Sequence, residues 1–336
     1  MNRYIKLLLL FLSINLNASE HVNVLIYHHV AENTPPSTTI SVETFIEHLD
    51  QISANQFNVV DLEWAISQIR AGKPIPDRSV AITFDDGFAD IYHNAFPLLK
   101  ERNLPFTLFV ATDAIDQKKK GMMSWEMIRE MKANGAIIAN HTTDHDYLVR
   151  KDSLDAEWLD SVWDNILSAQ NRIEEEIGEA PDWLAYPYGE YNNDLKHRLL
   201  ENNWIGFGQQ SGGIANFSDF QALPRFPAAG IYSSWKSLNV KLASKPLPID
   251  YKSLPDPIID DTNPPLLQAS LLNELPRQSE LACFIEGNSY SPAWLSKLSF
   301  IVQANKPLPK GRSRYNCTMP ANKGYYWLSL QWLNWK

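Results

Sequence analysis

Residues 80–90 read VAITFDDGFAD, an apolar run that leads directly into two neighbouring carboxylates and a glycine. The apolar run is typical of a buried strand. Two like charges side by side repel each other, and burying them is costly unless a positive group lies nearby. We therefore expect Asp85 and Asp86 to stand at the end of a buried strand, beside a cation, on a turn that Gly87 permits.

The chain around this stretch alternates strand patterns with helix patterns from residue 22 to about residue 230. Strands are predicted at HVNVLIYHH (21–29), SVAITFDDG (79–87), PFTLFVAT (105–112), AIIAN (136–140), WLAYPYG (183–189) and WIGFG (204–208). Ser41, Asp61 and Ser124 are predicted to cap helices, and a long amphipathic helix is expected between residues 154 and 177. This alternation predicts an α/β fold with a parallel sheet and helices outside it, open or closed into a barrel.

The N-terminal segment MNRYIKLLLLFLSINLNASE has the layout of a secretory signal peptide, with basic residues before an apolar run and small residues after it. We predict a signal peptide over residues 1–18 and an exported protein, periplasmic or secreted, with an uncleaved N-terminal anchor as the alternative. No later stretch is apolar over the length that a transmembrane segment needs. The formal net charge of −9 argues against nucleic-acid binding.

The last quarter of the chain differs in composition from the rest. Six prolines lie within residues 246–265, so we predict a linker without regular elements there, after a first domain over residues 19–245. Residues 266–336 alternate aromatic and turn residues, which predicts a small, sandwich-like β domain. Its many tyrosines and tryptophans form either its core or a sugar-stacking face. Cys283 and Cys317 are the only cysteines, and in an exported protein they favour a disulfide over two buried thiols.

Polar residues gather at the C-terminal ends of the predicted strands. They are His28 and His29, Asp85 and Asp86, Asn140 and His141, and Tyr188. These strand ends share one face in parallel α/β folds, and that face holds the active site. His141 and His145 are spaced i,i+4, which predicts two imidazoles on one side of a helical turn. With one carboxylate of the doublet they make a ligand set for a divalent metal that leaves positions open, while the other carboxylate stays free as a base.

These residues resemble the motifs of a known family. TFDDG (83–87), HTTDH (141–145) and YPYG (186–189) resemble those of the NodB-homology polysaccharide deacetylases, carbohydrate esterase family 4, over roughly residues 22–230. The resemblance implies a distorted (β/α) barrel and metal-dependent hydrolysis of the N-acetyl groups of a polysaccharide. It implies metal ligation by Asp86, His141 and His145, and a general-base role for Asp85. The backbone N–H of Tyr188 is then a donor to the oxyanion.

The expected cofactor is a divalent metal, with Zn²⁺ first. A set of two histidines and one carboxylate also suits Co²⁺, Ni²⁺ and Mn²⁺.

The chain departs from the family pattern in the residue that supplies the catalytic acid. No late histidine motif follows Tyr188, whereas Tyr27 and His28 stand together near the start. This placement is similar to the permuted subgroup that deacetylates the poly-β-1,6-N-acetylglucosamine of biofilm matrices. His28 is therefore the candidate acid, and His29 is the alternative. An acid and a base of opposite charge are expected to favour each other's ionised form.

A second departure concerns the arginine with which the family's third motif usually begins. This chain has Ala185 at that position. Arg225, in the segment LPRFP, is a candidate to orient Asp85 from another strand end, and a structural salt bridge is the alternative interpretation. The remaining histidines, His21, His48, His93 and His197, are interpreted as surface residues.

The expected substrate is an N-acetylated polysaccharide, with poly-β-1,6-N-acetylglucosamine first and peptidoglycan or chitooligosaccharides second. Two other classes stay open, a metalloamidase that acts on peptides and a non-catalytic glycan-binding protein. A glycoside hydrolase is disfavoured because Asp85 and Asp86 are too close in sequence to flank a glycosidic bond. The sequence does not indicate protein partners or an oligomeric state.

Overall fold

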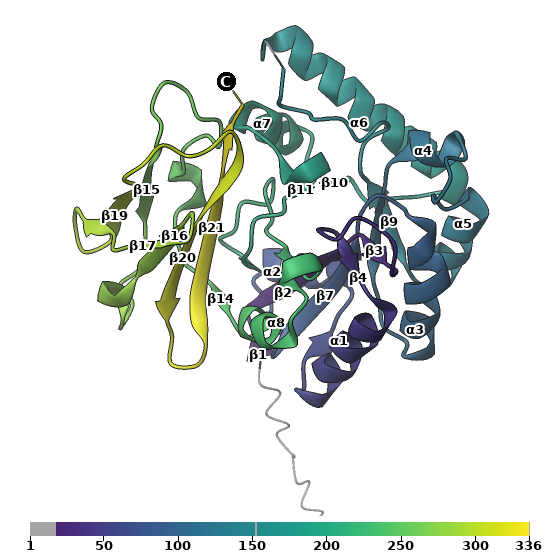
Figure 1. Cartoon of the computed structure of the whole chain (residues 1–336), viewed down its shortest axis with the longest axis horizontal. Coiled ribbons are helices and arrows are strands. Elements are labelled where there is room, and N and C mark those ends of the chain that lie inside the picture. Colours follow the sequence, from purple (N-terminus) through teal and green to yellow (C-terminus); the bar gives the residue numbers. More distant parts are fainter. Residues whose placement is uncertain (1–17, 152, 336) are drawn as a thin grey trace, which may run out of the picture.

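The computed structural model describes residues 18–151 and 153–335 (Figure 1). All but the last residue of the predicted signal peptide therefore lie outside the described residues. The largest sheet has nine strands in the order β11-β10-β9-β8-β7-β2-β12, with β13 beside β2 and β5 beside β7. Its strands are β2 (His21–Tyr27), β5 (Asn58–Val59), β7 (Ser79–Phe84), β8 (Thr107–Val110), β9 (Ile137–Asn140), β10 (Trp183–Ala185), β11 (Ile205–Phe207), β12 (Gly213–Ala215) and β13 (Phe226–Pro227).

Every pairing in this sheet is parallel except that of β12 with β2. The strands are buried on both faces, as expected for parallel strands between covering layers. In β7, for example, Val80, Ile82 and Phe84 belong to one hydrophobic cluster and Ala81 to another. The predicted α/β fold with a parallel sheet is confirmed, in the form of an open, curled half-barrel.

Helices cover the outside of this sheet, and Figure 1 shows α1, α3, α5 and α6 on the side away from the C-terminal strands. The helices are α1 (Val42–Ala54), α2 (Leu62–Arg70), α3 (Phe96–Glu101), α4 (Thr112–Asp116), α5 (Trp125–Ala133), α6 (Ala156–Ile177), α7 (Asn193–Glu201) and α8 (Trp235–Leu242). The predicted caps are confirmed, because the side chains of Ser41, Asp61 and Ser124 each accept a hydrogen bond from the first turn of their helix. No helix among residues 18–151 and 153–335 is both long and apolar enough to cross a bilayer.

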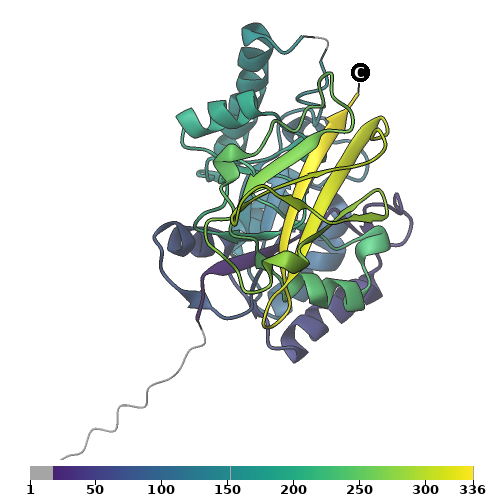
Figure 2. The ribbon, with the colours of Figure 1, turned by 90° about the vertical axis from the view of Figure 1, so that its left-hand side faces the viewer.

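The C-terminal strands form two further sheets (Figure 2). The five-stranded sheet contains β14 (Lys245–Pro246), β21 (Tyr325–Asn334), β20 (Gly311–Pro320), β16 (Ala282–Ile285) and β17 (Asn288–Tyr290). The three-stranded sheet contains β15 (Leu266–Ser270), β19 (Ser299–Gln303) and β18 (Ala293–Trp294). One hydrophobic cluster joins the two sheets, and a disulfide links Cys283 on β16 to Cys317, its direct partner on β20. The predicted disulfide is confirmed.

Residues 246–265 contain short elements, contrary to the expectation of a linker without any. Pro246 belongs to β14 and a 3₁₀ turn spans Tyr251–Ser253. Leu247, Ile249 and Ile259 are buried in the cluster that joins the C-terminal sheets. Proline is tolerated on an edge strand because its missing N–H faces away from the ladder, and β14 is such an edge.

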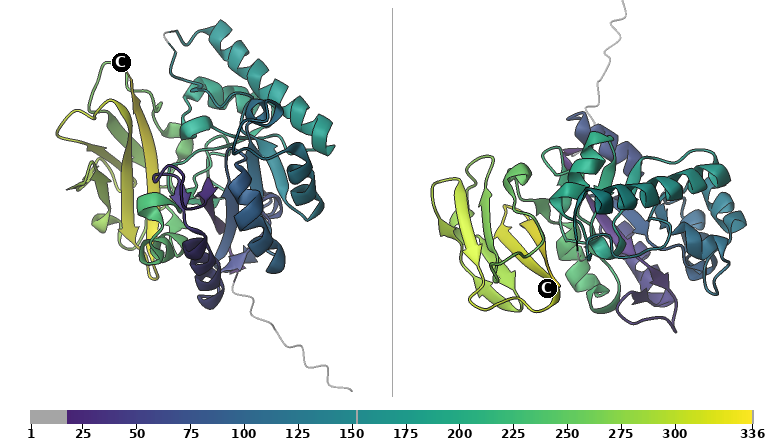
Figure 3. Two further views of the ribbon diagram at one scale, coloured as in Figure 1. Left: turned by 45° about the vertical axis from the view of Figure 1, so that its right-hand side comes forward. Right: turned by 90° about the horizontal axis from the view of Figure 1, so that it is seen from above.

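The C-terminal sheets pack against the half-barrel, as the two views of Figure 3 show. Trp327 of β21 packs edge-on against Phe226 of β13, with ring centroids 5.6 Å apart. Strand β14 pairs with β21, so the chain enters the C-terminal sheet directly after α8. Two short ladders complete the fold, β1 (Ala18–Ser19) with β6 (Ile75–Pro76) and β3 (His29–Val30) with β4 (Thr39–Ile40).

Candidate active site

The carboxyl ends of the central strands bring the predicted site residues to one edge of the sheet. These residues are His28 after β2, Asp85 and Asp86 after β7, His141 after β9 and Tyr188 after β10. A cavity of about 340 Å³ lies here, and its lining includes His28, Asp86, His145 and Tyr188. The strand-end face is the location at which parallel α/β folds hold their active sites.

Asp86 lies between the two histidines of the HTTDH motif. Its Oδ1 is 3.1 Å from Nε2 of His141 and 3.2 Å from Nε2 of His145. Burial opposes the ionisation of Asp86, but the contacts with both histidines outweigh it and hold the pKa of Asp86 well below its usual value. One ligand atom from each of these three residues lies within 4.8 Å of the others.

The chemistry of this donor set fits a cation. Nδ1 of His141 lies 2.6 Å from the carbonyl oxygen of Ala185, to which it donates its proton. In its neutral form the ring therefore presents the lone pair of Nε2 to Asp86, whereas the two aspartates raise the pKa of His141 against the effect of burial. Among residues 18–151 and 153–335, neither this nitrogen nor Oδ1 of Asp86 has a hydrogen bond of good geometry. Lone pairs that converge in this way are stabilised by a shared proton or by a bound metal ion.

The two histidines do not lie on a helical turn, contrary to the sequence prediction. They lie on the loop after β9, where the backbone N–H of His145 donates to Oγ1 of Thr142 at 3.1 Å. Thr142 and His145 have φ angles of 69° and 57°. The loop therefore brings the two histidines together through residues in the left-handed conformation, not through a helical turn. The rings still come together, with centroids 4.8 Å apart. The i,i+4 spacing predicted the proximity of the rings but not the backbone that produces it.

Backbone strain concentrates at this site. Asp86 and Tyr188 also have left-handed φ angles, of 76° and 59°, and neither is a glycine. Such conformations cost free energy and persist where the surrounding structure fixes them, often at functional sites. Gly87, with φ of 90°, supplies the predicted turn after the doublet.

Asp85 forms its ion pair with Arg225 rather than with the histidines. The guanidinium donates from Nη1 to Oδ1 at 2.7 Å and from Nη2 to Oδ2 at 2.8 Å, and both side chains are completely buried. The same guanidinium donates to the carbonyl oxygen of Gly208 and to Oγ1 of Thr83. Burial opposes the ionisation of Asp85, but Arg225 outweighs it and lowers the pKa of Asp85. The positive group expected beside the doublet is therefore Arg225.

His28 and His29 face different surroundings, as adjacent residues of an extended chain do. His28 lines the cavity that contains Asp86 and Tyr188. His29 is directed to Asp90, with its Nδ1 2.7 Å from Oδ2, and stacks on Phe88 with ring centroids 3.7 Å apart. Only His28 of the pair therefore borders the cavity.

Burial affects His28 more than its acidic neighbours do. It lowers the pKa of His28, although Asp86 and Asp85 oppose this shift. The expected mutual influence is present, because Asp85 raises the pKa of His28 and His28 lowers the pKa of Asp85, but burial outweighs it in the net shift of His28.

Tyr188 is held in its strained turn from two sides. Its ring stacks on Tyr147, with centroids 4.0 Å apart, and meets His145 edge-on. Its carbonyl oxygen accepts a hydrogen bond from Arg312 of β20. Arg312 also lies 3.4 Å from the buried carboxylate of Glu190.

Sequence reasoning missed that the C-terminal sheet contributes to this cavity. Arg312 and Arg314 of β20 line it together with the strand-end residues. The strand's alternation contained the signal, because Ser313 and Tyr315 are buried on the opposite face. Two arginines on the exposed face of a predicted strand indicate a contact surface.

The interpretation of His48 as a surface residue is wrong. His48 is completely buried in α1. Its Nδ1 lies 3.0 Å from the hydroxyl of Tyr27, and its Nε2 lies 2.6 Å from the carbonyl oxygen of Ser233. Both ring nitrogens are thus satisfied, which is what allows the imidazole to be buried.

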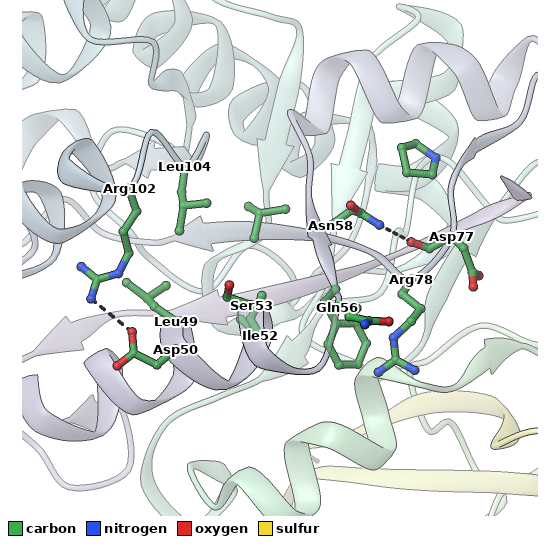
Figure 4. A pocket seen from close by; sticks show the side chains of 13 residues that line it. Leu49, Asp50, Ile52, Ser53, Gln56, Asn58, Asp77, Arg78, Arg102 and Leu104 are labelled. Atoms are coloured by element: carbon green, nitrogen blue, oxygen red, sulfur yellow. Dashed lines mark hydrogen bonds and ion pairs between the residues drawn. The ribbon is translucent and has the colours of Figure 1, made fainter. Parts of the chain in front are cut away.

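A larger cavity, of about 830 Å³, lies near the start of β7, away from the strand-end site (Figure 4). Two pairs of its polar groups interact with each other. Arg102 lies 3.2 Å from Asp50, and Asn58 donates to the carbonyl oxygen of Asp77. It offers no cluster of groups suited to catalysis.

Comparison with known proteins agrees with this site. Residues 72–203 match the family model of the polysaccharide deacetylases. The chain is similar to the poly-beta-1,6-N-acetyl-D-glucosamine N-deacetylase of Staphylococcus epidermidis, with 28% identity over 223 residues that cover 59% of this chain and 76% of that protein. It is also similar to the Escherichia coli (strain K12) enzyme of the same name, with 22% identity over 236 residues that cover 59% of this chain but only 35% of that protein.

Two solved structures share the half-barrel. IcaB from Ammonifex degensii aligns with a TM-score of 0.59 and 26% identity over 67% of this chain and 97% of that chain. The Streptococcus pyogenes deacetylase PplD in complex with acetate aligns with a TM-score of 0.59 and 19% identity over 66% of this chain and 98% of that chain. The fold and the matches place the chain among hydrolases that act on carbon–nitrogen bonds. Together these matches support a NodB-homology polysaccharide deacetylase.

Proposed function

We propose that this deacetylase removes N-acetyl groups from an N-acetylglucosamine polysaccharide with the help of a divalent metal. The observation that carries the proposal is the convergence of His141 and His145 on one oxygen of Asp86, next to the separately paired Asp85. In this proposal Asp86, His141 and His145 hold the metal, with Zn²⁺ first and Co²⁺, Ni²⁺ or Mn²⁺ as alternatives. When bound, such a metal supplies Lewis acidity and lowers the pKa of a water molecule.

Asp85 takes the role of general base. Its two oxygens accept from Arg225, which fixes the carboxylate plane and leaves further lone pairs to accept a proton from the attacking water. Its lowered pKa keeps it ionised at neutral pH. Arg225 acts as a positioning residue, since it is completely buried and contacts the base alone among the proposed catalytic groups.

His28 takes the role of general acid, and Tyr188 that of oxyanion donor. His28 lines the same cavity as Asp86, where a protonated imidazole can donate to the departing sugar amine. The N–H of Tyr188 is the proposed donor to the developing oxyanion, and the strained turn fixes its direction. The products are acetate and a glucosamine unit.

Poly-β-1,6-N-acetylglucosamine is the preferred substrate of this proposal. Its support is the early position of His28 and the names of the Staphylococcus epidermidis and Escherichia coli relatives. Peptidoglycan or chitooligosaccharides are the alternative substrates. Action on an external polysaccharide agrees with the predicted export to the periplasm or the medium.

The test is acetate release by the purified chain from these three glycans, with added Zn²⁺ or Co²⁺. The proposal expects release that is lost in Asp85→Asn, and the glycan with the highest kcat/KM identifies the substrate. Release that Asp85→Asn leaves unchanged would contradict the assigned base. Metal binding without release from any glycan would instead favour a glycan-binding role.

A further inference from the structure

A second cavity, of about 590 Å³, lies between helix α8 and the C-terminal strands β20 and β21. Figures 1 and 2 show α8 beside the end of this strand pair. Lys241 of α8 lines the cavity on one side, and Arg314 and Trp327 line it on the other. The cavity is therefore built jointly by the half-barrel domain and the C-terminal sheet.

Three side chains of this cavity, Lys241, Arg314 and Trp327, are hydrogen-bond donors without an acceptor among the described residues. Lys241 is 7% exposed, and its Nζ has no hydrogen-bond partner among residues 18–151 and 153–335. The indole N–H of Trp327 is buried and equally unpartnered within that range. The guanidinium of Arg314 makes no hydrogen bond or ion pair with any described residue. Buried donors without acceptors are costly, so this cavity is suited to a ligand that brings acceptors.

The charge of the cavity is positive although the chain as a whole carries a net charge of −9. No described carboxylate lines it. Burial, followed by the nearby Arg314, lowers the pKa of Lys241 to about 8, which still leaves it mostly protonated at neutral pH. Two cations in one cavity favour an anionic ligand, and the planar fork of an arginine matches a carboxylate or a phosphate.

The rim of the cavity is aromatic and exposed. Tyr232, Phe284 and Tyr325 line it and are 38%, 45% and 43% exposed. Exposed rings of this kind offer flat apolar faces to the C–H faces of pyranose sugars. Aromatic walls around cationic donors together match a sugar unit that carries an acidic group.

This cavity is continuous with the active site. Arg314 and Tyr232 line both cavities, so the second cavity adjoins the one with His28 and Asp86 along these two side chains. We infer that it is a glycan subsite that takes a sugar unit bearing a carboxylate or phosphate, next to the N-acetylated unit at the strand ends. The inference rests on the proposed deacetylase activity, because it assumes that one glycan chain occupies both cavities. It does not rest on the preferred substrate named above, since poly-β-1,6-N-acetylglucosamine carries no acidic unit, and it points to a mixed, acidic polysaccharide instead.

A structural role for these residues is the competing interpretation. Nζ of Lys241 lies 4.6 Å from the ring centroid of Tyr232, and this cation–π contact can hold the lysine without any ligand. Such a role predicts no preference among glycans.

Binding affinity separates the two interpretations. The probes are a neutral N-acetylglucosamine oligomer, an alternating N-acetylglucosamine–glucuronate oligomer and a phosphorylated N-acetylglucosamine oligomer, all of equal length, measured by calorimetry on the full chain. We expect at least one acidic oligomer to bind about tenfold more tightly than the neutral one, with a preference that weakens at high salt. Which acidic oligomer binds identifies the acidic group.

The variants Lys241→Met and Arg314→Gln should each remove that preference, while Lys236→Met, an exposed lysine of the same helix, should not. Unchanged thermal unfolding of Arg314→Gln shows that its effect is local. Equal affinity for all three oligomers, or a preference that survives both variants, would overturn the inference. Free phosphate or glucuronate that binds as tightly as the oligomers would also overturn it, because the site would then be a simple anion site.

Acetate release from the same oligomers is measured in parallel. Selective binding of an acidic oligomer without acetate release from any of them would leave the subsite intact and refute the proposed function. Release from all oligomers without selective binding would support the proposed function and refute the subsite.

Discussion

Arg225 donates to both carboxylate oxygens of Asp85, at 2.7 and 2.8 Å, although the two residues are 140 positions apart in the chain. The pair is completely buried. Resemblance to the family suggested an arginine at the position of Ala185, which instead offers its carbonyl oxygen to His141. The arginine beside Asp85 thus comes from the residue that precedes β13, and the short pairing of β13 with β2 sets its position.

Replacing this arginine should affect stability and activity together. Arg225→Met leaves the charge of Asp85 buried without a partner, which we expect to cost about 3–5 kcal/mol of stability and at least about 100-fold in kcat. Denaturant unfolding and acetate release measure the two effects. Arg225→Lys keeps the charge but loses the fork, so it should recover stability better than kcat.

The double variant that combines Asp85→Asn with Arg225→Met is the control for the single replacement of Arg225. It removes the buried charge, so it should regain part of the lost stability while remaining inactive. A double variant as unstable as Arg225→Met would show that the arginine acts through Gly208 and Thr83 rather than through Asp85.

Replacing His28 and replacing His29 should have different effects on activity. His28→Gln should lower kcat by about 10²–10⁴, as expected for loss of a general acid, with little change in KM. His29→Gln should disturb its contacts with Asp90 and Phe88, and therefore stability, more than kcat. The kinetic constants of both variants at one pH provide the test, and the opposite order of effects would assign the acid to His29.

The contact of Arg312 with the Tyr188 turn predicts an effect of the C-terminal sheet on catalysis. Arg312→Ala should lower kcat/KM by about tenfold, because Tyr188 loses one of its two supports. Stability should change little, since Glu190 keeps its paired contacts with Arg150. Arg277→Ala, which removes an exposed ion pair of the same region, is the matched control. Equal kcat/KM in both variants would show that the turn does not need Arg312.

The lowered pKa of Lys241 predicts that replacing this residue stabilises the folded protein by an amount that depends on pH. Its pKa falls from 10.5 in the unfolded chain to about 8 in the folded state. Between these values the unfolded chain binds the proton more strongly, so stability rises as the pH rises through this window. Lys241→Met should therefore be more stable than the wild type at pH 7, by up to about 3 kcal/mol, and the gain should vanish near pH 10.5. A melting temperature at pH 7 that does not rise would indicate a compensating partner for the lysine.

The strands and most helices followed from local patterns. Apolar runs such as that of β7 and caps such as Ser41 and Ser124 depend on neighbours in sequence, and each stands as expected. The strand-end rule then brought His28, Asp86 and His141 to one edge of the sheet, because parallel strands end at the same edge. Local pattern and a topological rule were enough for these residues.

Other features depend on contacts that no local pattern contains. The left-handed residues Thr142 and His145 were missed, since neither position carries the glycine that would signal that conformation. His48 was missed because its burial depends on Tyr27 and on the carbonyl oxygen of Ser233, far away in sequence. The arginines of β20 were missed in part for this reason: the alternation of the strand indicates that they share an exposed face, but only the docking of the C-terminal sheet places that face at the cavity.

The measurement that tests the account most directly is the recovery of acetate release from an N-acetylglucosamine polymer as Zn²⁺ is titrated into chelator-treated protein. The account predicts that chelation abolishes release, that about one equivalent of metal per chain restores it, and that His141→Ala neither binds that equivalent nor recovers. Full release by the chelated protein, or metal-restored release in His141→Ala, would contradict the assignment of Asp86, His141 and His145 as the metal site.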